Sequence, residues 1–379
     1  MKTVIFGAGN AGQHLLKEMK AHGEQQVDAF LDNFVDTDKA IQGISVYRPD
    51  AYLKKNTSDC AIIAAGSQKA IWLMIRKLRE YHIENIWMLH EIAGTNHLSL
   101  YDANRNFLPT RVRKIHFDDR KPTLPYFEIP IIDDCNLNCK GCLFNCNQHG
   151  EKNYMTLDEI VFDFRRMKDL FYDIPWIRIL GGEPLLHPQL ADVVQTARAI
   201  FPDAEIDICT NGLRVPSLPK EVLQTIAENR ITMHISEYRP VEKIARKISA
   251  CLQEFQIEHC FMPRDQFYKF YTQKPVNDAE ASHDACPTCG CREVHCGRLV
   301  KCSAILAFER MNKQFGTHYE THEGEEWFDL HNMSLTGWDI LQKLDGAVSA
   351  CRYCDMQHKE FFSWTPGTKE QLEDYVLDV

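Results

Sequence analysis

The sequence predicts an α/β protein with two regions of parallel sheet and a cysteine-rich C-terminal region. Short apolar segments alternate with amphipathic segments over residues 1–98 and again over residues 125–275. Strands that alternate with helices indicate parallel sheets covered by helices. The fifteen cysteines are concentrated: four lie in residues 135–146, five in 286–302 and two in 351–354. Such clusters in a long chain favour metal binding over a disulfide framework.

Length and charge narrow the classes of function. A chain of 379 residues is too long for one ordinary core, so we expect two or three domains. The net charge of −10 argues against a nucleic-acid partner, which normally requires a basic surface. No apolar run approaches the roughly 20 residues of a membrane span, and the apolar segment after Lys2 breaks at Gly7, too early for a signal peptide. We therefore expect a cytoplasmic protein that binds neither nucleic acid nor membrane.

Residues 1–98 have the pattern of a nucleotide-binding sheet. Gly7, Gly9 and Gly12 form GxGxxG between the first strand and the first helix, and Asp32 ends the second strand. In this motif the pyrophosphate binds at the helix N-terminus and the acidic residue binds a ribose hydroxyl. The expected strands are 3–6, 27–31, 61–65 and 86–89, and the expected helices are 11–20 and 71–81.

This first region resembles the Rossmann-like domains that accompany polysaccharide and nucleotide-sugar enzymes. The resemblance implies NAD or a nucleotide-sugar as its ligand, bound by the three glycines and Asp32. The alternative is a scaffold that binds nothing and keeps its glycines for a tight turn. Residues 1–98 also lack the second mononucleotide-binding half of a complete dehydrogenase domain.

A polar, proline-containing linker is expected over residues 99–124, where the alternation of strands and helices is lost. The alternation resumes over residues 125–275 with five strand–helix repeats, which fit a partial (β/α) barrel. The chemistry of such folds lies at the carboxyl ends of the strands. The expected strands are 127–132, 176–180, 206–209, 231–235 and 257–261, and the expected helices are 157–171, 189–200, 220–227 and 241–255.

The first cysteine cluster lies in the loop after the first barrel strand. Cys135, Cys139 and Cys142 occur there in the sequence CNLNCKGC. Three thiolates can hold three irons of a four-iron cluster and leave the fourth iron open to an external ligand. The alternative is a structural zinc ion that takes these cysteines as three of its four ligands.

The CxxxCxxC spacing, with GGEP after the next strand, resembles the radical S-adenosylmethionine (radical SAM) superfamily. The resemblance implies a catalytic 4Fe–4S cluster on Cys135, Cys139 and Cys142 whose open iron binds S-adenosylmethionine (SAM). One electron from the cluster then cleaves SAM to a 5′-deoxyadenosyl radical. The GGEP segment is implied to bind the methionine amino group, with Glu183 as the charged acceptor and the glycines allowing close approach. Its residues are Gly181, Gly182, Glu183 and Pro184.

Residues at the ends of later strands complete the implied SAM site. Thr210 and Asn211 follow the third strand, and Ser236 ends the fourth; by the resemblance they contact the ribose and carboxylate. Gly141 departs from the superfamily pattern, which often has an aromatic residue there that packs on adenine. Phe144 is a candidate substitute.

The second cysteine cluster resembles a twitch domain, a shortened relative of the SPASM domain. A Gly-x4-Cys turn at Gly297–Cys302 and a CxxC at residues 351–354 carry this resemblance over residues 276–379. It implies one auxiliary 4Fe–4S cluster held by Cys286, Cys302, Cys351 and Cys354. Zinc is the alternative, and Cys289, Cys291 and Cys296 compete as ligands.

The layout of barrel and twitch-like domain resembles radical SAM alcohol dehydrogenases of aminoglycoside biosynthesis. The resemblance implies an oxidoreductase or lyase that acts on a sugar, aminocyclitol or nucleotide-linked sugar and takes electrons from a donor such as flavodoxin or ferredoxin. In dehydrogenation, the radical removes hydrogen from a carbinol carbon and a base takes the hydroxyl proton. The auxiliary cluster accepts the second electron. Glu237 and Tyr238, at a strand end, are candidate bases.

Three alternatives stay open. Epimerisation, or dehydration, is possible within the same class, and an epimerase needs a hydrogen-atom donor, for which Cys260 is the candidate. Peptide modification is frequent among proteins with twitch and SPASM domains, but residues 1–98 are predicted as α/β and not as a peptide-binding winged helix. A non-catalytic iron–sulfur redox sensor is disfavoured by the intact GGEP segment.

Overall fold

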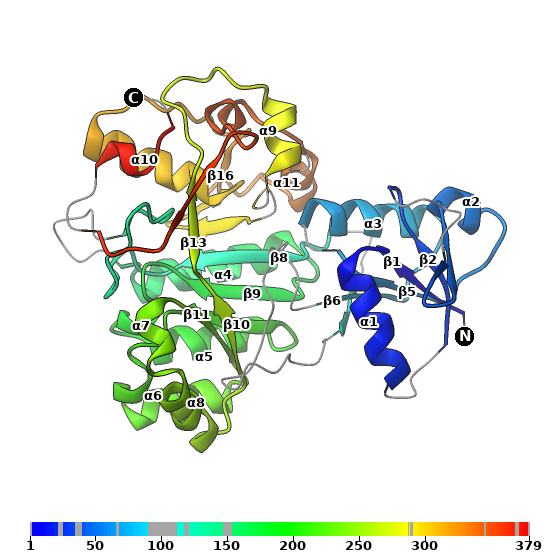
Figure 1. Cartoon of the computed structure of the whole chain (residues 1–379), viewed down its shortest axis with the longest axis horizontal. Helices are drawn as coiled ribbons and strands as arrows, with labels where there is room; N and C mark the ends of the chain where they lie inside the picture. Colours follow the sequence, from blue (N-terminus) through cyan, green and yellow to red (C-terminus); the bar gives the residue numbers. More distant parts are fainter. Residues whose placement is uncertain are drawn as a thin grey trace.

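The computed structural model of the chain describes most of its residues and shows three regions (Figure 1). An N-terminal sheet lies to one side of a central barrel-like sheet, and the C-terminal region packs against the barrel. The described residues are 2–21, 26–34, 40–65, 68–89, 112–116, 121–146, 154–286, 288, 291–344, 346–367 and 371–377.

The N-terminal sheet is parallel at its centre and antiparallel at both edges. Its parallel strands run in the order β4-β2-β1-β5-β6, with β3 and β7 at the edges. The interior strands β1 and β5 are buried along their whole length because helices cover the sheet. The strands are β1 (Thr3–Phe6), β2 (Val27–Leu31), β3 (Ala40–Ile41), β4 (Ile44–Tyr47), β5 (Cys60–Ile63), β6 (Ile86–Leu89) and β7 (Val112–Lys114), and the helices are α1 (Asn10–Ala21), α2 (Pro49–Leu53) and α3 (Gln68–Glu80).

The central sheet begins with five parallel strands in chain order, β8 to β12. Its first helix, α4, starts at a capping box in which Thr156 and Glu159 satisfy each other's backbone N–H groups, as predicted. The strands are β8 (Tyr126–Pro130), β9 (Trp176–Leu180), β10 (Glu205–Thr210), β11 (Thr232–Glu237) and β12 (His259–Pro263), and the helices are α4 (Leu157–Leu170), α5 (Leu190–Ile200), α6 (Lys220–Glu228), α7 (Arg239–Glu242) and α8 (Ala245–Glu254).

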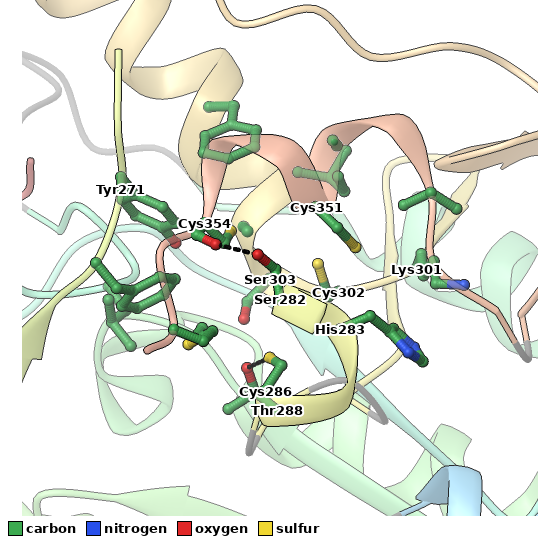
Figure 2. Close-up of a pocket in the computed structure, with 18 residues that line it drawn as sticks. Tyr271, Ser282, His283, Cys286, Thr288, Lys301, Cys302, Ser303, Cys351 and Cys354 are labelled. Carbon is green, nitrogen blue, oxygen red and sulfur yellow. Dashed lines mark hydrogen bonds between the residues drawn. The ribbon is translucent and has the colours of Figure 1, made fainter. Parts of the chain in front are cut away.

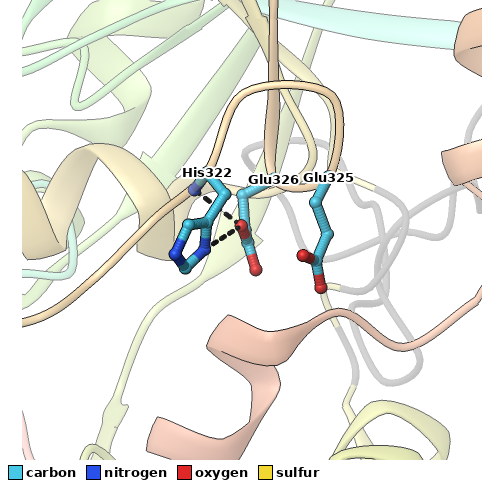
Figure 3. A group of neighbouring side chains, drawn as sticks. All are labelled: His322, Glu325 and Glu326. Carbon is cyan, nitrogen blue, oxygen red and sulfur yellow. Dashed lines mark hydrogen bonds and ion pairs between the residues drawn. The ribbon is translucent and has the colours of Figure 1, made fainter.

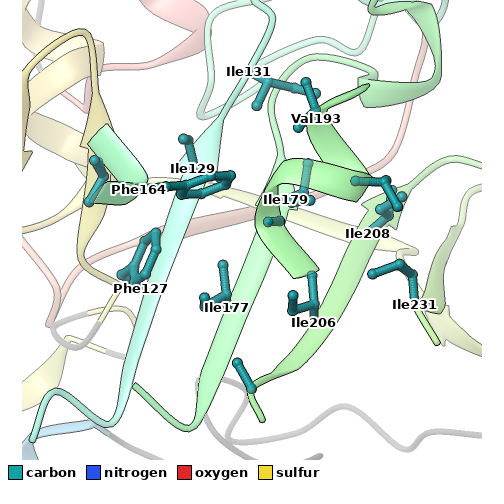
Figure 4. Packing of buried hydrophobic residues seen from close by; sticks show 14 of the residues in the cluster. Phe127, Ile129, Ile131, Phe164, Ile177, Ile179, Val193, Ile206, Ile208 and Ile231 are labelled. Atoms are coloured by element: carbon teal, nitrogen blue, oxygen red, sulfur yellow. The ribbon is translucent and has the colours of Figure 1, made fainter. Parts of the chain in front are cut away.

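The two faces of this sheet differ sharply in chemistry. Alternate residues such as Ile129, Ile177 and Ile206 point outward and form one apolar core with the covering helices (Figure 4). Residues between them, including Glu128 and Arg178, belong to the opposite, inner face, because successive strand residues point to opposite sides. Parallel strands are usually apolar on both faces, so a charged inner face indicates a site.

The C-terminal region extends the barrel sheet instead of forming a separate layer. Strand β14 pairs with β8, and β15 and β16 continue the sheet. Strands β13 and β17 pair with each other in a separate two-stranded antiparallel sheet. The elements are β13 (Gln266–Lys269), α9 (Ala279–Ala285), β14 (Glu293–His295), β15 (Arg298–Val300), α10 (Ser303–Phe315), β16 (Trp327–Asp329), α11 (Gly337–Leu344) and β17 (Glu360–Ser363).

The α/β fold class with parallel sheets is confirmed, and several boundaries are corrected. The expected helix 241–255 is two helices, α7 and α8. Within the expected linker, β7 is a strand of the N-terminal sheet, whereas residues 99–111 and 117–120 lie outside the described residues. Among the described residues, no helix has the length and apolar character that a bilayer crossing requires.

Asp163 gives a pH-dependent test of this packing. Its carboxylate is fully buried on α4 and accepts a 2.9 Å hydrogen bond from the Gly297 amide, and burial raises its pKa to about 7. Because this pKa exceeds the roughly 3.9 of an unfolded aspartate, ionisation destabilises the fold as pH rises from about 4 through 7. Asp163→Asn should therefore gain stability over the wild type between pH 5 and pH 8, by about 3 kcal/mol at most. Urea unfolding at both pH values measures the difference; an identical pH dependence in the two proteins would refute it.

Candidate active site

Cys135, Cys139 and Cys142 converge on one cavity at the carboxyl ends of the barrel strands. All three line this cavity together with Gly181, Gly182 and residues at the ends of β10 and β11. The three sulfurs do not all lie within 4.8 Å of one another, and the Cys142 sulfur lies 3.8 Å from that of Cys146, which also lines the cavity.

Nitrogen donors point at two of these sulfurs. The Leu137 amide lies 3.4 Å and the Asn211 side-chain amide 3.8 Å from the Cys135 sulfur. The buried Trp364 indole donates to the Cys139 sulfur over 3.0 Å. Burial raises the pKa of the Cys135 thiol, so a thiolate at this position needs such donors and a bound cation. The donor set fits a metal–thiolate cluster.

The GGEP segment packs directly on the backbone that leads into the cysteine loop. The Gly182 amide donates to the Ile132 carbonyl over 2.6 Å, and the Glu183 amide donates to that of Asp134 over 2.8 Å. A Cβ on Gly181 would lie 2.3 Å from the Ile132 carbonyl oxygen, and one on Gly182 would lie 2.2 Å from that of Asp134. The glycines are therefore required by this close packing, before any ligand is considered.

Glu183 connects three parts of the site. Its fully buried carboxylate accepts hydrogen bonds from the Thr210 hydroxyl (2.5 Å), the Asn211 amide (2.9 Å) and the Leu185 amide (3.0 Å). Burial raises its pKa to about 7. Its carboxylate is thus already satisfied, and it does not line the cavity. In this structure Glu183 positions the ends of β9 and β10 through these bonds. Pro184 starts a short 3-10 helix, η1 (Pro184–Leu186), behind it.

The predicted residues at later strand ends divide into two groups. Thr210, Asn211, Ser236 and Tyr238 line the cavity. Glu237 and Cys260 are buried, but the structure does not place them on the cavity wall.

Sequence reasoning missed several polar residues of the cavity wall. They lie on the inner face of the sheet or just beyond its strands: Glu128, Arg178, Cys209, Arg264 and Cys291. The available signal was a charge inside an otherwise apolar strand, as in YFEIP and WIRIL. Arg178 is held by a 2.7 Å ion pair with the buried Asp207.

The four cysteines of the predicted auxiliary site line a second pocket (Figure 2). Cys286 follows α9, Cys302 precedes α10, and Cys351 and Cys354 lie in and just after the short helix η3 (Ser349–Tyr353). Burial raises the pKa of the Cys302 and Cys354 thiols. No three of their sulfurs lie within 4.8 Å of one another. This pocket shares Leu143, Thr288 and Ser303 with the first cavity. Cys291 belongs to that first cavity, Cys296 is exposed, and Cys289 lies outside the described residues.

A third group of potential ligands has a structural explanation. His322, Glu325 and Glu326 place ligand atoms within 4.8 Å of one another (Figure 3). Glu326 accepts hydrogen bonds from the Ser349 hydroxyl and the Ala350 amide, and Glu325 accepts one from the Ser349 amide. These carboxylates hold the first residues of η3, the short helix that contains Cys351.

The N-terminal glycines serve close packing at two of three positions. A Cβ on Gly7 would lie 2.3 Å from the Ala64 carbonyl oxygen, and one on Gly12 would lie 2.0 Å from that of Gly7, whereas Gly9 has nothing within 4 Å. Asp32 accepts hydrogen bonds from the Ala8 amide (2.8 Å) and the Phe34 amide (2.7 Å). The Asp32 carboxylate therefore fixes the glycine turn itself.

Comparison with known proteins agrees with this geometry. Residues 129–255 match the family model of the Radical SAM superfamily. The chain contains a radical SAM domain. Such a domain implies a 4Fe–4S cluster and SAM. The radical SAM domain is similar to GTP 3′,8-cyclase of Clostridium perfringens (strain SM101 / Type A), with 29% identity over 144 residues, or 34% of this chain and 43% of the relative. The chain thus spans less than half the length of this relative.

Two solved structures show limited similarity. Streptococcus suis SuiB bound to S-adenosylmethionine shares 21% identity, with a TM-score of 0.30, over 37% of this chain and 33% of that one. BtrN in complex with AdoMet and 2-DOIA shares 16% identity, with a TM-score of 0.38, over 61% of this chain and 92% of that one.

Gly141 allows a test of how the cysteine loop is held. Its φ is +64°, and a Cβ there would lie 2.7 Å from the Phe362 ring and 2.9 Å from the Asp374 carbonyl oxygen. Gly141→Ala should lower the free energy of unfolding by about 1–3 kcal/mol, through backbone strain and overpacking. Gly367→Ala is the matched control, because its Cβ would have only ordinary contacts, the nearest at 3.5 Å. Equal urea unfolding of both variants would contradict this reading of the loop.

Proposed function

We propose that this chain is a radical SAM enzyme in which Cys135, Cys139 and Cys142 hold the catalytic 4Fe–4S cluster. The observation that supports this most directly is that the three thiols share one cavity with the GGEP backbone and with Thr210, Asn211 and Ser236. The cluster and SAM supply a carbon-centred radical when bound. The cavity walls hold SAM and the substrate side by side, and an external donor such as flavodoxin or ferredoxin supplies electrons.

The proposed reaction is dehydrogenation of a hydroxyl group on a sugar, aminocyclitol or nucleotide-linked sugar. The polar, charged inner wall of the cavity supports a small hydroxylated substrate. The second pocket adjoins this cavity, so an auxiliary 4Fe–4S cluster on Cys286, Cys302, Cys351 and Cys354 lies in a suitable place to accept an electron. Cys260, the hydrogen-atom donor expected for epimerisation, does not line the cavity, whereas Cys209 and Cys291 do. The adjoining second pocket is therefore what favours dehydrogenation.

The N-terminal sheet is proposed to bind NAD or a nucleotide-sugar. Its parallel strands lie in the order β4-β2-β1-β5-β6. If these five strands are numbered 1 to 5 along the chain, the order is 3-2-1-4-5, which is that of dinucleotide-binding folds. The open space above Gly9 supports the approach of a pyrophosphate to the backbone.

Transfer of deuterium tests the reaction. The anaerobically reconstituted enzyme is incubated with SAM, a reductant and sugars, aminocyclitols or UDP-sugars deuterated at one carbinol carbon. We expect one deuterium in 5′-deoxyadenosine and an equal amount of ketone. Deuterium transfer without oxidation of the substrate would point to epimerisation or dehydration, and failure to cleave SAM with any reductant would favour a sensor.

Iron content separates the two cysteine sets. The wild type should hold about eight irons, and either Cys139→Ala or Cys302→Ala should lower this by up to about four. Cys139→Ala should abolish formation of 5′-deoxyadenosine, whereas Cys302→Ala should still cleave SAM and lose ketone formation. Iron and zinc are measured by plasma mass spectrometry; about four irons with stoichiometric zinc in the wild type would disprove the auxiliary cluster.

Trp364→Phe should make the catalytic cluster harder to reduce. The Trp364 indole donates to the Cys139 sulfur, and such a bond favours the reduced, more negative cluster. Its loss should shift the one-electron equilibrium about fivefold to tenfold toward the oxidised state, where tenfold corresponds to about 59 mV. A redox titration followed by electron paramagnetic resonance measures the midpoint, with Trp338→Phe on the exposed surface as control. An unchanged midpoint in Trp364→Phe would contradict the assignment of Cys139.

A further inference from the structure

Two glutamate side chains lie next to each other on neighbouring strands of the barrel sheet. Glu128 of β8 and Glu293 of β14 are register partners. Their exposed fractions are 6% and 0%. Burial raises the pKa of both carboxyl groups, and the neighbouring Glu128 carboxylate raises the pKa of Glu293 further.

Their surroundings are different. Glu128 lines the cavity that contains Cys135, Cys139 and Cys142, and it accepts a hydrogen bond from the Tyr126 hydroxyl. Two cations, Arg178 and Arg264, favour its ionised form. The other charged or titratable groups that act on Glu128 or are affected by it are Asp207, Cys291 and Glu293.

Glu293 lacks this support. Neither of its carboxyl oxygens has a hydrogen-bond partner in the described part of the chain. Arg310 favours its ionised form, but that guanidinium is already paired with Asp133 over 2.5 Å. A buried carboxyl group without partners is most stable when it is neutral. The two environments therefore favour a proton on Glu293 and a negative charge on Glu128, as in other carboxyl pairs whose pKa values are moved apart by their surroundings.

We propose that Glu128 is the catalytic base that accepts the hydroxyl proton of the substrate, and that Glu293 is its neutral positioning partner. The proposal rests on the dehydrogenation proposed above. The carbinol C–H bond breaks and its hydrogen atom goes to the radical derived from SAM, forming 5′-deoxyadenosine. The O–H proton goes to a carboxylate oxygen of Glu128. The remaining electron leaves to the oxidised auxiliary cluster as the C=O bond forms, so that two electrons and two protons are accounted for.

Glu128 meets the requirements of a base better than the residues expected from the sequence. Tyr238 lines the cavity, but burial raises its pKa well above the usual value, so its hydroxyl stays protonated. Glu237 is buried away from the cavity wall. Glu128 combines a place on that wall with a carboxylate stabilised by a hydroxyl group and two guanidinium groups.

Infrared spectroscopy of the reconstituted enzyme tests the charge state without a substrate. At pH 8 the wild type should show a protonated carboxyl band that is absent from Glu293→Gln and kept in Glu128→Gln. Asp163→Asn serves as the matched control, because Asp163 is a buried carboxylate away from the cavity. Loss of the band in Glu128→Gln would mean that Glu128 carries the proton and cannot accept another, which would overturn the proposal.

Ketone formation from the deuterated substrates provides the second test. Glu128→Gln should lower ketone formation at least about 100-fold, as expected for loss of a general base, and Glu128→Asp should restore part of it. Iron content should be unchanged in both Glu128 variants, and Asp163→Asn should match the wild type in ketone formation. Ketone formation by Glu128→Gln within threefold of the wild type would overturn the proposal. Absence of SAM cleavage in every protein, wild type included, would instead overturn the proposed function, and the infrared arm would still decide the state of the pair.

Discussion

The candidate site depends on a backbone contact in which Gly181 and Gly182 lie against residues 132–134. This contact leaves no space for a Cβ at either glycine, and it joins the end of β9 to the loop that carries the cysteine triad. Glu183 then extends the contact to the end of β10, because its carboxylate binds Thr210 and the Asn211 amide. Three strand ends and the cysteine loop are thereby fixed by one hydrogen-bonded unit, which places the thiols before any metal binds.

The inner face of the sheet provides the second half of the site. Its charged groups have polar partners. Arg178 forms an ion pair with Asp207, and Glu128 accepts a hydrogen bond from the Tyr126 hydroxyl. Charges are costly to bury unless they are paired, so these pairs preserve a polar wall inside a fold that otherwise packs apolar strands. The C-terminal region completes the wall because β14 adds to the edge of the same sheet. The cavity, the cysteine triad and the second cysteine pocket consequently form one continuous unit.

Much of this arrangement could be predicted from the sequence, and the remainder depends on contacts that sequence patterns do not encode. Apolar periodicity located the barrel strands, and CxxxCxxC with GGEP located the cavity. Glu128 was overlooked because a single charge within YFEIP does not show which face of the strand is the inner one. Trp364 reaches the Cys139 sulfur across 225 residues of chain, and no local pattern reports such a contact. The GGEP pattern identified Glu183, whereas its bonds to Thr210 and to the Asn211 amide depend on the tertiary structure.

The most direct test of the central claim is whether SAM binds an open iron of the cluster held by Cys135, Cys139 and Cys142. The reduced enzyme with SAM labelled with ¹⁵N in the amino group and ¹⁷O in the carboxylate can be measured by electron–nuclear double resonance. We predict hyperfine coupling of both labels to the cluster, and loss of both couplings in Cys135→Ala. A reconstituted wild-type enzyme that binds SAM without either coupling would contradict the account.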